Sequence, residues 1–198
     1  AYAYDQTGKL TSLTDPTGAT STYTYEASGL RSTATTSAGA QRFVWDPTAA
    51  VPELLTDGTH QYVYGVGSTP IAQVNADNSV DYLHTDQTGS VRTVTDHSGN
   101  VVADSDYSPY GIPLDVNGAP ISAITPFGYA GQYTDPTGLL YLRARYYDPT
   151  TSQFLTIDPL VAATHLPYAY TPGNPVQLTD PLGLDWWGNS SDAMAGSG

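Results

Sequence analysis

The sequence contains no cysteine and few positively charged residues. Without cysteine, the chain can form no disulfide framework, no thiolate metal site and no cysteine nucleophile. Six Lys and Arg against nineteen Asp and Glu give a net charge of −13. This charge disfavours binding to nucleic acid or anionic membranes, because both need basic patches. No apolar run approaches the roughly 18 residues of a membrane-spanning helix. An electrostatic partner would therefore be cationic.

Methionine and phenylalanine are also scarce, whereas the chain has 16 Tyr, 19 Gly and 15 Pro. Aromatic and β-branched residues favour strands, and Gly and Pro favour the turns between them. The composition therefore predicts a mostly β fold with many turns and little helix.

A short aromatic unit recurs along the first third of the chain. Two aromatic residues flank one other residue, and the second aromatic recurs at intervals of 21, 20 and 19 residues at Tyr4, Tyr25, Trp45 and Tyr64. Alternating residues on both sides of Gly-containing turns are typical of β-hairpins. We expect successive hairpins to form one continuous antiparallel sheet.

The two aromatic residues of each unit lie on the same face of a strand, because side chains alternate with period 2. One interpretation is that they form cross-strand ladders, each pair contributing roughly 0.2–1 kcal/mol. The other is a carbohydrate-binding or adhesive surface. The regular repetition, with no accompanying polar cluster, favours the structural interpretation.

The histidines do not show the spacing of metal ligands. His84 and Asp86 flank one residue, but the H-T-D-x-x-G-S pattern favours a turn in which Asp86 caps the backbone and His84 is packed or hydrogen-bonded locally. His60, His97 and His165 are isolated. We therefore expect no metal and no cofactor.

Two Asp-Pro pairs stand out near the end of the chain. They lie at Asp158-Pro159 and Asp180-Pro181, separated by a segment that is rich in Pro, Tyr and Asn and too broken for a helix. Asp-Pro and Pro-x-Gly sequences form turns, because Pro fixes φ and Gly tolerates positive φ. The second pair continues to Gly183 and Leu184, whereas the first continues to Leu160 and Val161. The chain has six Asp-Pro pairs, so spacing alone does not single these out.

Together with GYAGQYTDPTGLLYLRARYYDP at residues 128–149, this segment resembles the core-associated domain that closes RHS/YD-repeat proteins. The earlier residues resemble degenerate YD repeats. The resemblance implies a curled or spiralling antiparallel shell of hairpins that ends in a plug. It also implies that Asp158 and Asp180 cut the chain after Leu184, at the Leu184-Asp185 bond, to free a C-terminal cargo or toxin. Val161 departs from the glycine of the family's first box, which affects the turn after Asp158.

Such a cut is aspartyl proteolysis, in which one carboxylate acts as base towards water while the other carboxyl donates a proton. Like charges held close together raise one of the two pKa values. A single turnover needs no substrate affinity, because the fold holds the bond beside the acids. Asp158 and Asp180 are thus either a catalytic pair in a single-turnover autoprotease or turn-capping residues, and Pro181 and Gly183 support the second turn.

Residues 141–147 alternate as in a strand, which places Arg143 and Arg145 on one face. These two cations are either solvated charges that pair with nearby acids or partners of the aspartate pair. Both interpretations stay open at the level of sequence.

We expect three regions: YD/RHS-repeat hairpins at 1–125, a core domain at 126–184 and a short tail at 185–198 that begins a cargo or linker. The chain begins inside a repeat, so we interpret it as part of a longer secreted or cell-surface protein. Its expected partners are upstream repeats, an encapsulated C-terminal cargo and other copies, through open sheet edges. The alternative function is a non-catalytic structural or adhesive YD-repeat protein. In the tail, Trp186 and Trp187 are expected to dock on the plug or inner wall.

Overall fold

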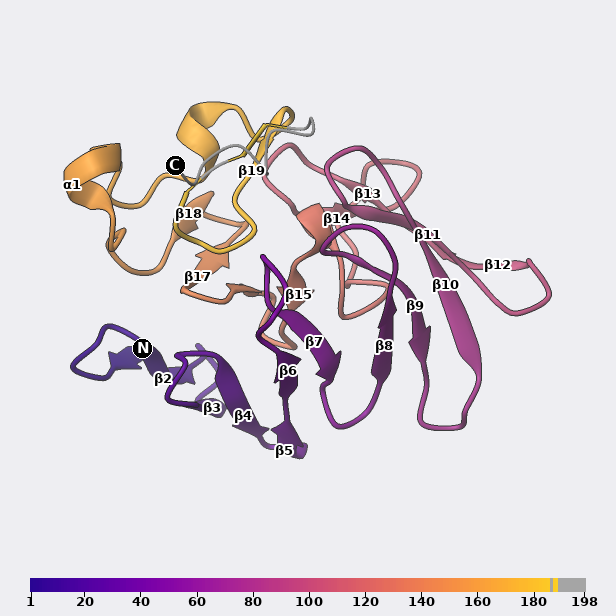
Figure 1. Ribbon diagram of the computed structural model, residues 1–198, viewed down its shortest axis with the longest axis horizontal. Coiled ribbons are helices and arrows are strands. Elements are labelled where there is room, and N and C mark those ends of the chain that lie inside the picture. Colours follow the sequence, from indigo (N-terminus) through magenta and orange to yellow (C-terminus); the bar gives the residue numbers. More distant parts are fainter. Residues whose placement is uncertain (186, 189–198) are drawn as a thin grey trace.

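The computed structural model describes residues 1–185 and 187–188, which fold mostly as short antiparallel strands joined by tight turns (Figure 1). The first sheet has five strands in sequence order. They are β1 (Tyr2–Tyr4), β2 (Leu10–Thr14), β3 (Thr20–Tyr25), β4 (Arg31–Thr36) and β5 (Gly39–Arg42). Several turns share one design, in which an Asp carboxylate accepts the N–H two residues later and a glycine with positive φ follows, as at Asp5, Thr7 and Gly8.

The second sheet has seven strands, again paired in sequence order. They are β6 (Val44–Asp46), β7 (Glu53–Thr56), β8 (Gln61–Tyr64), β9 (Pro70–Val74), β10 (Val80–Thr85), β11 (Val91–Thr95) and β12 (Val101–Asp104). The expectation of one continuous sheet is therefore wrong. The break falls at Phe43, which lies between β5 and β6, is 1% exposed and donates its N–H to the carbonyl of Ser32. Burying this ring directs the chain into the core and ends the first sheet.

The later residues form shorter elements. A two-stranded pair, β13 (Asp106–Tyr107) and β14 (Pro113–Leu114), precedes the 3₁₀ turn η1 (Tyr129–Gly131). A four-stranded sheet follows, made of β15 (Tyr133–Thr134), β16 (Leu140–Leu142), β17 (Arg145–Asp148) and β18 (Gln153–Phe154). The chain then passes through α1 (Val161–Thr164), η2 (Thr171–Gly173) and the pair β19 (Leu178–Thr179) and β20 (Trp187–Gly188).

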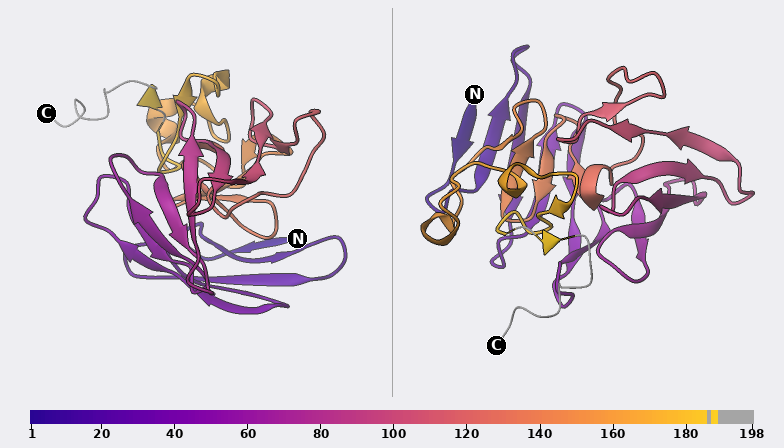
Figure 2. Two further views of the ribbon diagram at one scale, coloured as in Figure 1. Left: turned by 90° about the vertical axis from the view of Figure 1, so that its right-hand side faces the viewer. Right: turned by 90° about the horizontal axis from the view of Figure 1, so that it is seen from above.

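The two large sheets form a curved wall, and the segment from about residue 126 onwards, here called the plug, packs against one side of it (Figure 2). The main core joins both parts, since Leu10, Leu54 and Val91 of the wall cluster with Phe127 and Tyr141 of the later segment. This core contains residues from both sides of position 125, so it does not divide the chain there. The expected boundaries at residues 125 and 184 stay predictions.

Aromatics of the second, third and fourth repeat units form this contact, which corrects the expected cross-strand ladders, whereas Tyr2 and Tyr4 of the first unit are exposed. Their ring partners lie in the later segment and not in the neighbouring strand. The pairs are Tyr23 with Tyr146 at 5.3 Å, Trp45 with Tyr141 at 5.8 Å and Tyr62 with Phe127 at 4.7 Å between ring centroids. Aromatic pairs of this kind add about 0.5–1.5 kcal/mol each beyond area burial. The inward aromatics of the repeats therefore attach the plug to the wall.

One buried ion pair reinforces that attachment. Arg31 at the start of β4 is fully buried, and its Nη1 donates to both carboxylate oxygens of Asp135 at 2.7 and 2.8 Å. The guanidinium carbon lies 4.0 Å from the ring centroid of Phe43 and 4.6 Å from that of Tyr141. Desolvation of a buried charge is offset only by such direct pairing and ring contacts.

No helix among residues 1–185 and 187–188 is long and apolar enough to cross a membrane.

Candidate functional site

The site begins with a tight turn. Residues 141–147, expected as one strand, are instead a hairpin in which Leu142 pairs with Arg145 across a two-residue loop. Arg143 takes a left-handed backbone conformation with φ 60°, and the N–H of Ala144 donates to the carbonyl of Leu142 at 2.7 Å. The alternating pattern concealed this reversal because the loop carries no Gly, Pro, Asn or Asp.

Arg145, the first residue of β17, brings the two predicted aspartates together. Its Nη2 lies 3.8 Å from Oδ2 of Asp158 and 3.4 Å from Oδ2 of Asp180. All three side chains are at most 4% exposed. The guanidinium also lies over the ring of Phe154, 3.6 Å from its centroid. Arg145 is thus not a solvated strand charge but a cation between two buried carboxylates.

Asp180 contacts the amide of the expected cleavage bond and the amide before it. Its Oδ1 accepts the N–H of Leu184 at 3.0 Å and the N–H of Asp185 at 3.2 Å. Burial raises the pKa of Asp180 to about 6, although Arg145 and these amides oppose the rise. A carboxyl with this pKa carries a proton for part of the time near neutral pH.

Asp158 has a different set of donors. Its Oδ1 accepts the N–H of Leu160 at 2.8 Å, and its Oδ2 accepts the hydroxyl of Thr164 at 2.9 Å. Thr164 ends α1, which begins at Val161 and has no positive-φ residue until its C-cap His165. The turn after Asp158 therefore needs no glycine at position 161, because the chain continues into a helical turn and not into a left-handed conformation. The segment between the two Asp-Pro pairs was expected to contain no helix. That expectation is wrong for one helical turn, α1.

The last turn before the expected cut docks on the β16–β17 loop. The N–H of Ala144 donates to the carbonyl of Leu182 at 3.0 Å, and Arg145 Nε donates to the carbonyl of Gly183 at 2.5 Å. Gly183 has φ 68°, and a Cβ there would lie 2.8 Å from the carbonyl oxygen of Leu142. Glycine is required both by the turn and by this close approach.

Arg143 holds the same turn from another side. Its Nη1 donates to the carbonyl of Pro181 at 3.3 Å and to the side-chain oxygen of Gln132 at 2.5 Å. Its Nη2 donates to the carbonyl of Pro52, in the loop between β6 and β7, at 3.2 Å. Arg143 is 5% exposed, so it too is not a solvated charge. It links the wall to the segment around Pro181.

Other predicted residues have the expected structural roles. Asp86 caps its turn by accepting the N–H groups of Thr88 and Ser90, and His84 Nε2 lies 2.9 Å from the hydroxyl of Thr95. The predicted docking of Trp186 and of the Trp187 side chain lies outside the described residues.

A further buried carboxylate, which the sequence did not reveal, is Asp57, fully buried in the turn between β7 and β8. It accepts hydrogen bonds from the hydroxyls of Tyr62 at 2.8 Å and Tyr133 at 3.0 Å, and lies 3.1 Å from His60 Nδ1. Burial would raise the pKa of Asp57, but the hydrogen bonds outweigh it and hold the pKa below its usual range. The contact with Asp57 raises the pKa of His60. The pairing with Tyr133 crosses 76 residues and has no local sequence signal.

Comparison with known proteins identifies the family of this chain. A model of the teneurin YD-shell matches residues 53–173, and a model of the RHS repeat matches residues 4–41. The chain belongs to the RHS/YD-repeat family. Among these RHS/YD-repeat relatives, the double-stranded DNA deaminase toxin A of Burkholderia cenocepacia (strain H111) is 31% identical over 92% of this chain. The tRNA nuclease WapA of Bacillus subtilis (strain 168) is 29% identical over 94% of it.

A solved structure shows the same shell fold. The crystal structure of TcdB2-TccC3-Cdc42 superposes on 93% of this RHS/YD-repeat chain with a TM-score of 0.72 and 25% identity. The match covers only 10% of that chain, and the two curated relatives are covered over 14% and 8% of their lengths. The chain therefore corresponds to a small part of each relative.

Proposed function

We propose that this chain closes an RHS/YD shell and cuts itself once, at the Leu184-Asp185 bond, to free the segment that follows. The observation that carries the proposal is that the Asp180 carboxylate accepts the N–H of this bond, that of Asp185, and the N–H of the preceding peptide, that of Leu184. A second buried carboxylate, Asp158, lies on the same guanidinium nitrogen of Arg145. Turn capping alone explains one of these carboxylates but not their convergence.

The proposed reaction is a hydrolysis. A water oxygen adds to the carbonyl carbon of Leu184 while Asp158, the base, takes a proton from the water. Asp180 Oδ1 accepts the N–H of Asp185 before the reaction. Once the carbonyl carbon has become tetrahedral, the nitrogen can accept a proton, and the protonated form of Asp180 donates one to it as the C–N bond breaks. The products are a chain that ends in the Leu184 carboxylate and a fragment that begins with the Asp185 amine. Arg145 stabilises the negative charge that the two carboxyls share during the transfer.

The fold prepares the bond for this reaction. The carbonyls of Pro181, Leu182 and Gly183 are each held by a donor from the β16–β17 loop. Holding a substrate segment in place converts the cut into a unimolecular step, and a single turnover tolerates a slow catalyst.

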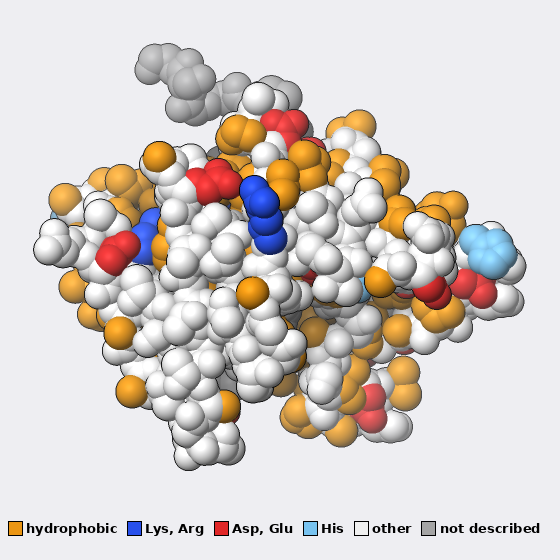
Figure 3. Space-filling model, turned by 90° about the horizontal axis from the view of Figure 1, so that it is seen from below, with side chains coloured by type: hydrophobic (Ala, Val, Ile, Leu, Met, Phe, Trp, Pro, Cys, Tyr) orange, Lys and Arg blue, Asp and Glu red, His pale blue; other side chains and the backbone are white. Residues whose placement is uncertain are grey.

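The wider role rests on the relatives. Those named above are toxins or nucleases, and this chain spans a small part of each. We therefore propose that upstream repeats continue the wall at β1, the edge strand of the first sheet, and that a toxin cargo follows Leu184. We also propose that the whole protein acts outside the cell that makes it. The face in Figure 3 has only scattered Lys and Arg side chains, which disfavours nucleic acid as a partner of the shell.

The test is the release of a folded fusion protein placed after Gly198. We expect first-order release at a rate independent of protein concentration, because the reaction is intramolecular. Asp158→Asn and Asp180→Asn should each stop release while keeping the β-rich circular dichroism spectrum. Asp148→Asn is the matched control, since Asp148 also precedes a proline but caps an exposed turn at Thr150. An uncut, folded wild-type fusion would support the alternative, in which the boxes only close the shell.

A further inference from the structure

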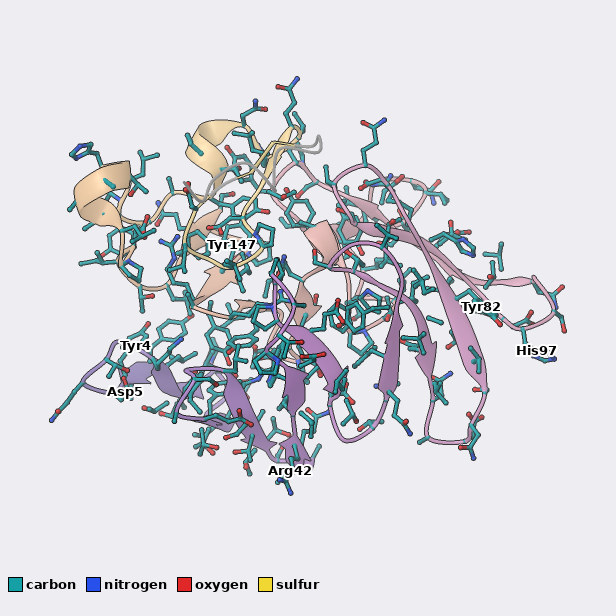
Figure 4. The ribbon with its side chains drawn as sticks, in the orientation of Figure 1. Tyr4, Asp5, Arg42, Tyr82, His97 and Tyr147 are labelled. Carbon is teal, nitrogen blue, oxygen red and sulfur yellow. The ribbon has the colours of Figure 1, made fainter. Side chains whose placement is uncertain are left out.

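Lys9 is the sole lysine of the sequence and ends the turn between β1 and β2. Its Nζ lies 3.2 Å from the carbonyl oxygen of Arg143 and 3.3 Å from that of Ala144. These carbonyls belong to the β16–β17 loop, 134 residues away in the sequence. Figure 4 labels Tyr4 and Asp5 on the same hairpin, below the segment that carries β17 and β18. The first repeat hairpin thus contacts the loop that carries the candidate site.

The peptide group between Arg143 and Ala144 has a partner at each end. Its carbonyl accepts a hydrogen bond from Lys9, and its N–H is shared between the carbonyls of Leu142 at 2.7 Å and Leu182 at 3.0 Å. Leu182 lies two residues before the Leu184-Asp185 bond. Hydrogen bonds in such a chain polarise one another, and a charged donor makes the first bond stronger than a neutral one would. The ammonium of Lys9 therefore strengthens the bond that holds the cleavage segment.

The Lys9 side chain is itself held by the repeats. Its Nζ lies 5.6 Å from the ring centroid of Tyr25, a cation–π contact. A Cβ at Gly29, in the turn between β3 and β4, would lie 3.6 Å from Lys9 Cε, so the stem runs across this glycine. Burial lowers the pKa of Lys9, while Asp5 opposes the change. Lys9 can reach the two carbonyls only when the β1–β2 and β3–β4 hairpins are packed in place.

We propose that Lys9 is a positioning residue for self-cleavage, which couples the cut to packing of the repeat wall on the core. The inference rests on the proposed function. Lys9 does not touch the reacting bond; it acts through the Arg143–Ala144 peptide. A chain whose first hairpins have not packed would therefore cleave slowly, and the cargo would be freed only inside a formed shell.

The test measures the first-order release rate of the fusion in variants of Lys9. Lys9→Met removes the ammonium but keeps the stem, and we expect cleavage to slow about 10- to 100-fold, the cost of a small misplacement of a reacting group. Lys9→Arg keeps the charge and the donors and should restore most of the rate. Arg42→Met is the matched control, because it removes one positive charge from an exposed side chain at the end of β5, away from the site (Figure 4). A Lys9→Met rate equal to that of Arg42→Met would overturn the proposal.

A second measurement separates this proposal from self-cleavage itself. In the uncut Asp158→Asn chain, Lys9→Met should speed hydrogen exchange of the Ala144 amide about tenfold or more, with the Val94 amide of β11 unchanged. Unchanged exchange at Ala144 would show that Lys9 does not hold this peptide. A wild-type fusion that never cleaves would instead refute the proposed function, while the exchange still reports on Lys9. If Lys9→Met does not fold, Lys9→Gln replaces it, and wild-type release by Lys9→Gln would overturn the proposal.

Discussion

Two five-residue turns of this chain have nearly the same sequence and different surroundings: the Asp135 box (residues 135–139, DPTGL) and the Asp180 box (residues 180–184, DPLGL). Both aspartates are at most 4% exposed, and both face a buried arginine. Arg31 forms an ion pair with Asp135, donates to both of its oxygens and also donates to the hydroxyl of Tyr146. Arg145 instead lies between Asp180 and a second carboxylate.

The backbone of the two boxes differs as well. The Asp135 box closes the β15–β16 hairpin, with the N–H of Asp135 bonded to the carbonyl of Leu139. In the Asp180 box the carboxylate accepts the amides of Leu184 and Asp185. The Asp135 box thus joins a hairpin turn to the wall through Arg31. The Asp180 box instead places the Leu184-Asp185 peptide bond against a carboxyl group. The motif supplies a turn, and its partners decide what the aspartate does.

The largest expected difference between the two boxes is in the rate of cleavage after substitution of the aspartate. Asp180→Asn should slow cleavage by about 100- to 10,000-fold, the usual contribution of a general acid or base. Asp135→Asn, measured below its own melting temperature, should still release the fusion. The measurement is the release rate by gel densitometry. Release by Asp180→Asn at the wild-type rate would remove the distinction.

The second effect separates the boxes by stability. Asp135→Asn leaves Arg31 buried without its carboxylate, and breaking a buried pair costs about 3–5 kcal/mol. Urea unfolding should show this loss in the free energy of unfolding. Asp148→Asn, at an exposed turn, is the control and should change it by less than about 1 kcal/mol. A small loss for Asp135→Asn would mean that the ring contacts of Arg31, not the ion pair, attach the plug.

The third effect is the pH dependence of the Asp180 box. The pKa of Asp180 is raised to about 6 by burial, so the protonated acid that the reaction needs is lost as pH rises through this value. The cleavage rate should therefore fall above about pH 6. The folded pKa also exceeds the unfolded one, so its stabilising contribution is complete below about pH 4 and is lost as pH rises through about 6, a change of up to about 3 kcal/mol.

The first trend is tested by the release rate of the wild-type fusion from pH 4 to 8. The second is tested by urea unfolding of the uncut Asp158→Asn chain over the same pH range. A cleavage rate that rises through pH 6 would contradict the role of Asp180 as acid.

The smallest effect concerns the two glycines. Gly138→Ala forces a left-handed alanine with φ near 82° into open space, at a cost of about 1–2 kcal/mol. Gly183→Ala meets the carbonyl oxygen of Leu142 at 2.8 Å in addition and should also slow release. Melting temperature and release rate, measured on both variants, distinguish the two. Equal release rates would show that the Asp180 box does not need its close approach to β16.

The sequence predicted the hairpin repeats and the aromatic faces, because these follow from period-2 patterns and turn residues. The family motif singled out Asp158 and Asp180, and their catalytic role stays a prediction. The sequence did not predict the break at Phe43 or the reversal at Arg143, since neither position carries a turn signal. It also did not show that Arg31 pairs with Asp135, or which of Arg143 and Arg145 lies between Asp158 and Asp180. Those pairings join residues far apart in the chain and depend on how the plug packs against the wall.

Self-cleavage at the Leu184-Asp185 bond can be measured from the masses of the fragments of a purified fusion and of its Asp180→Asn variant. We expect one fragment that ends at Leu184 and one that begins at Asp185, with the variant intact. An intact wild-type chain that is folded, or a variant cut at the same bond, would contradict it.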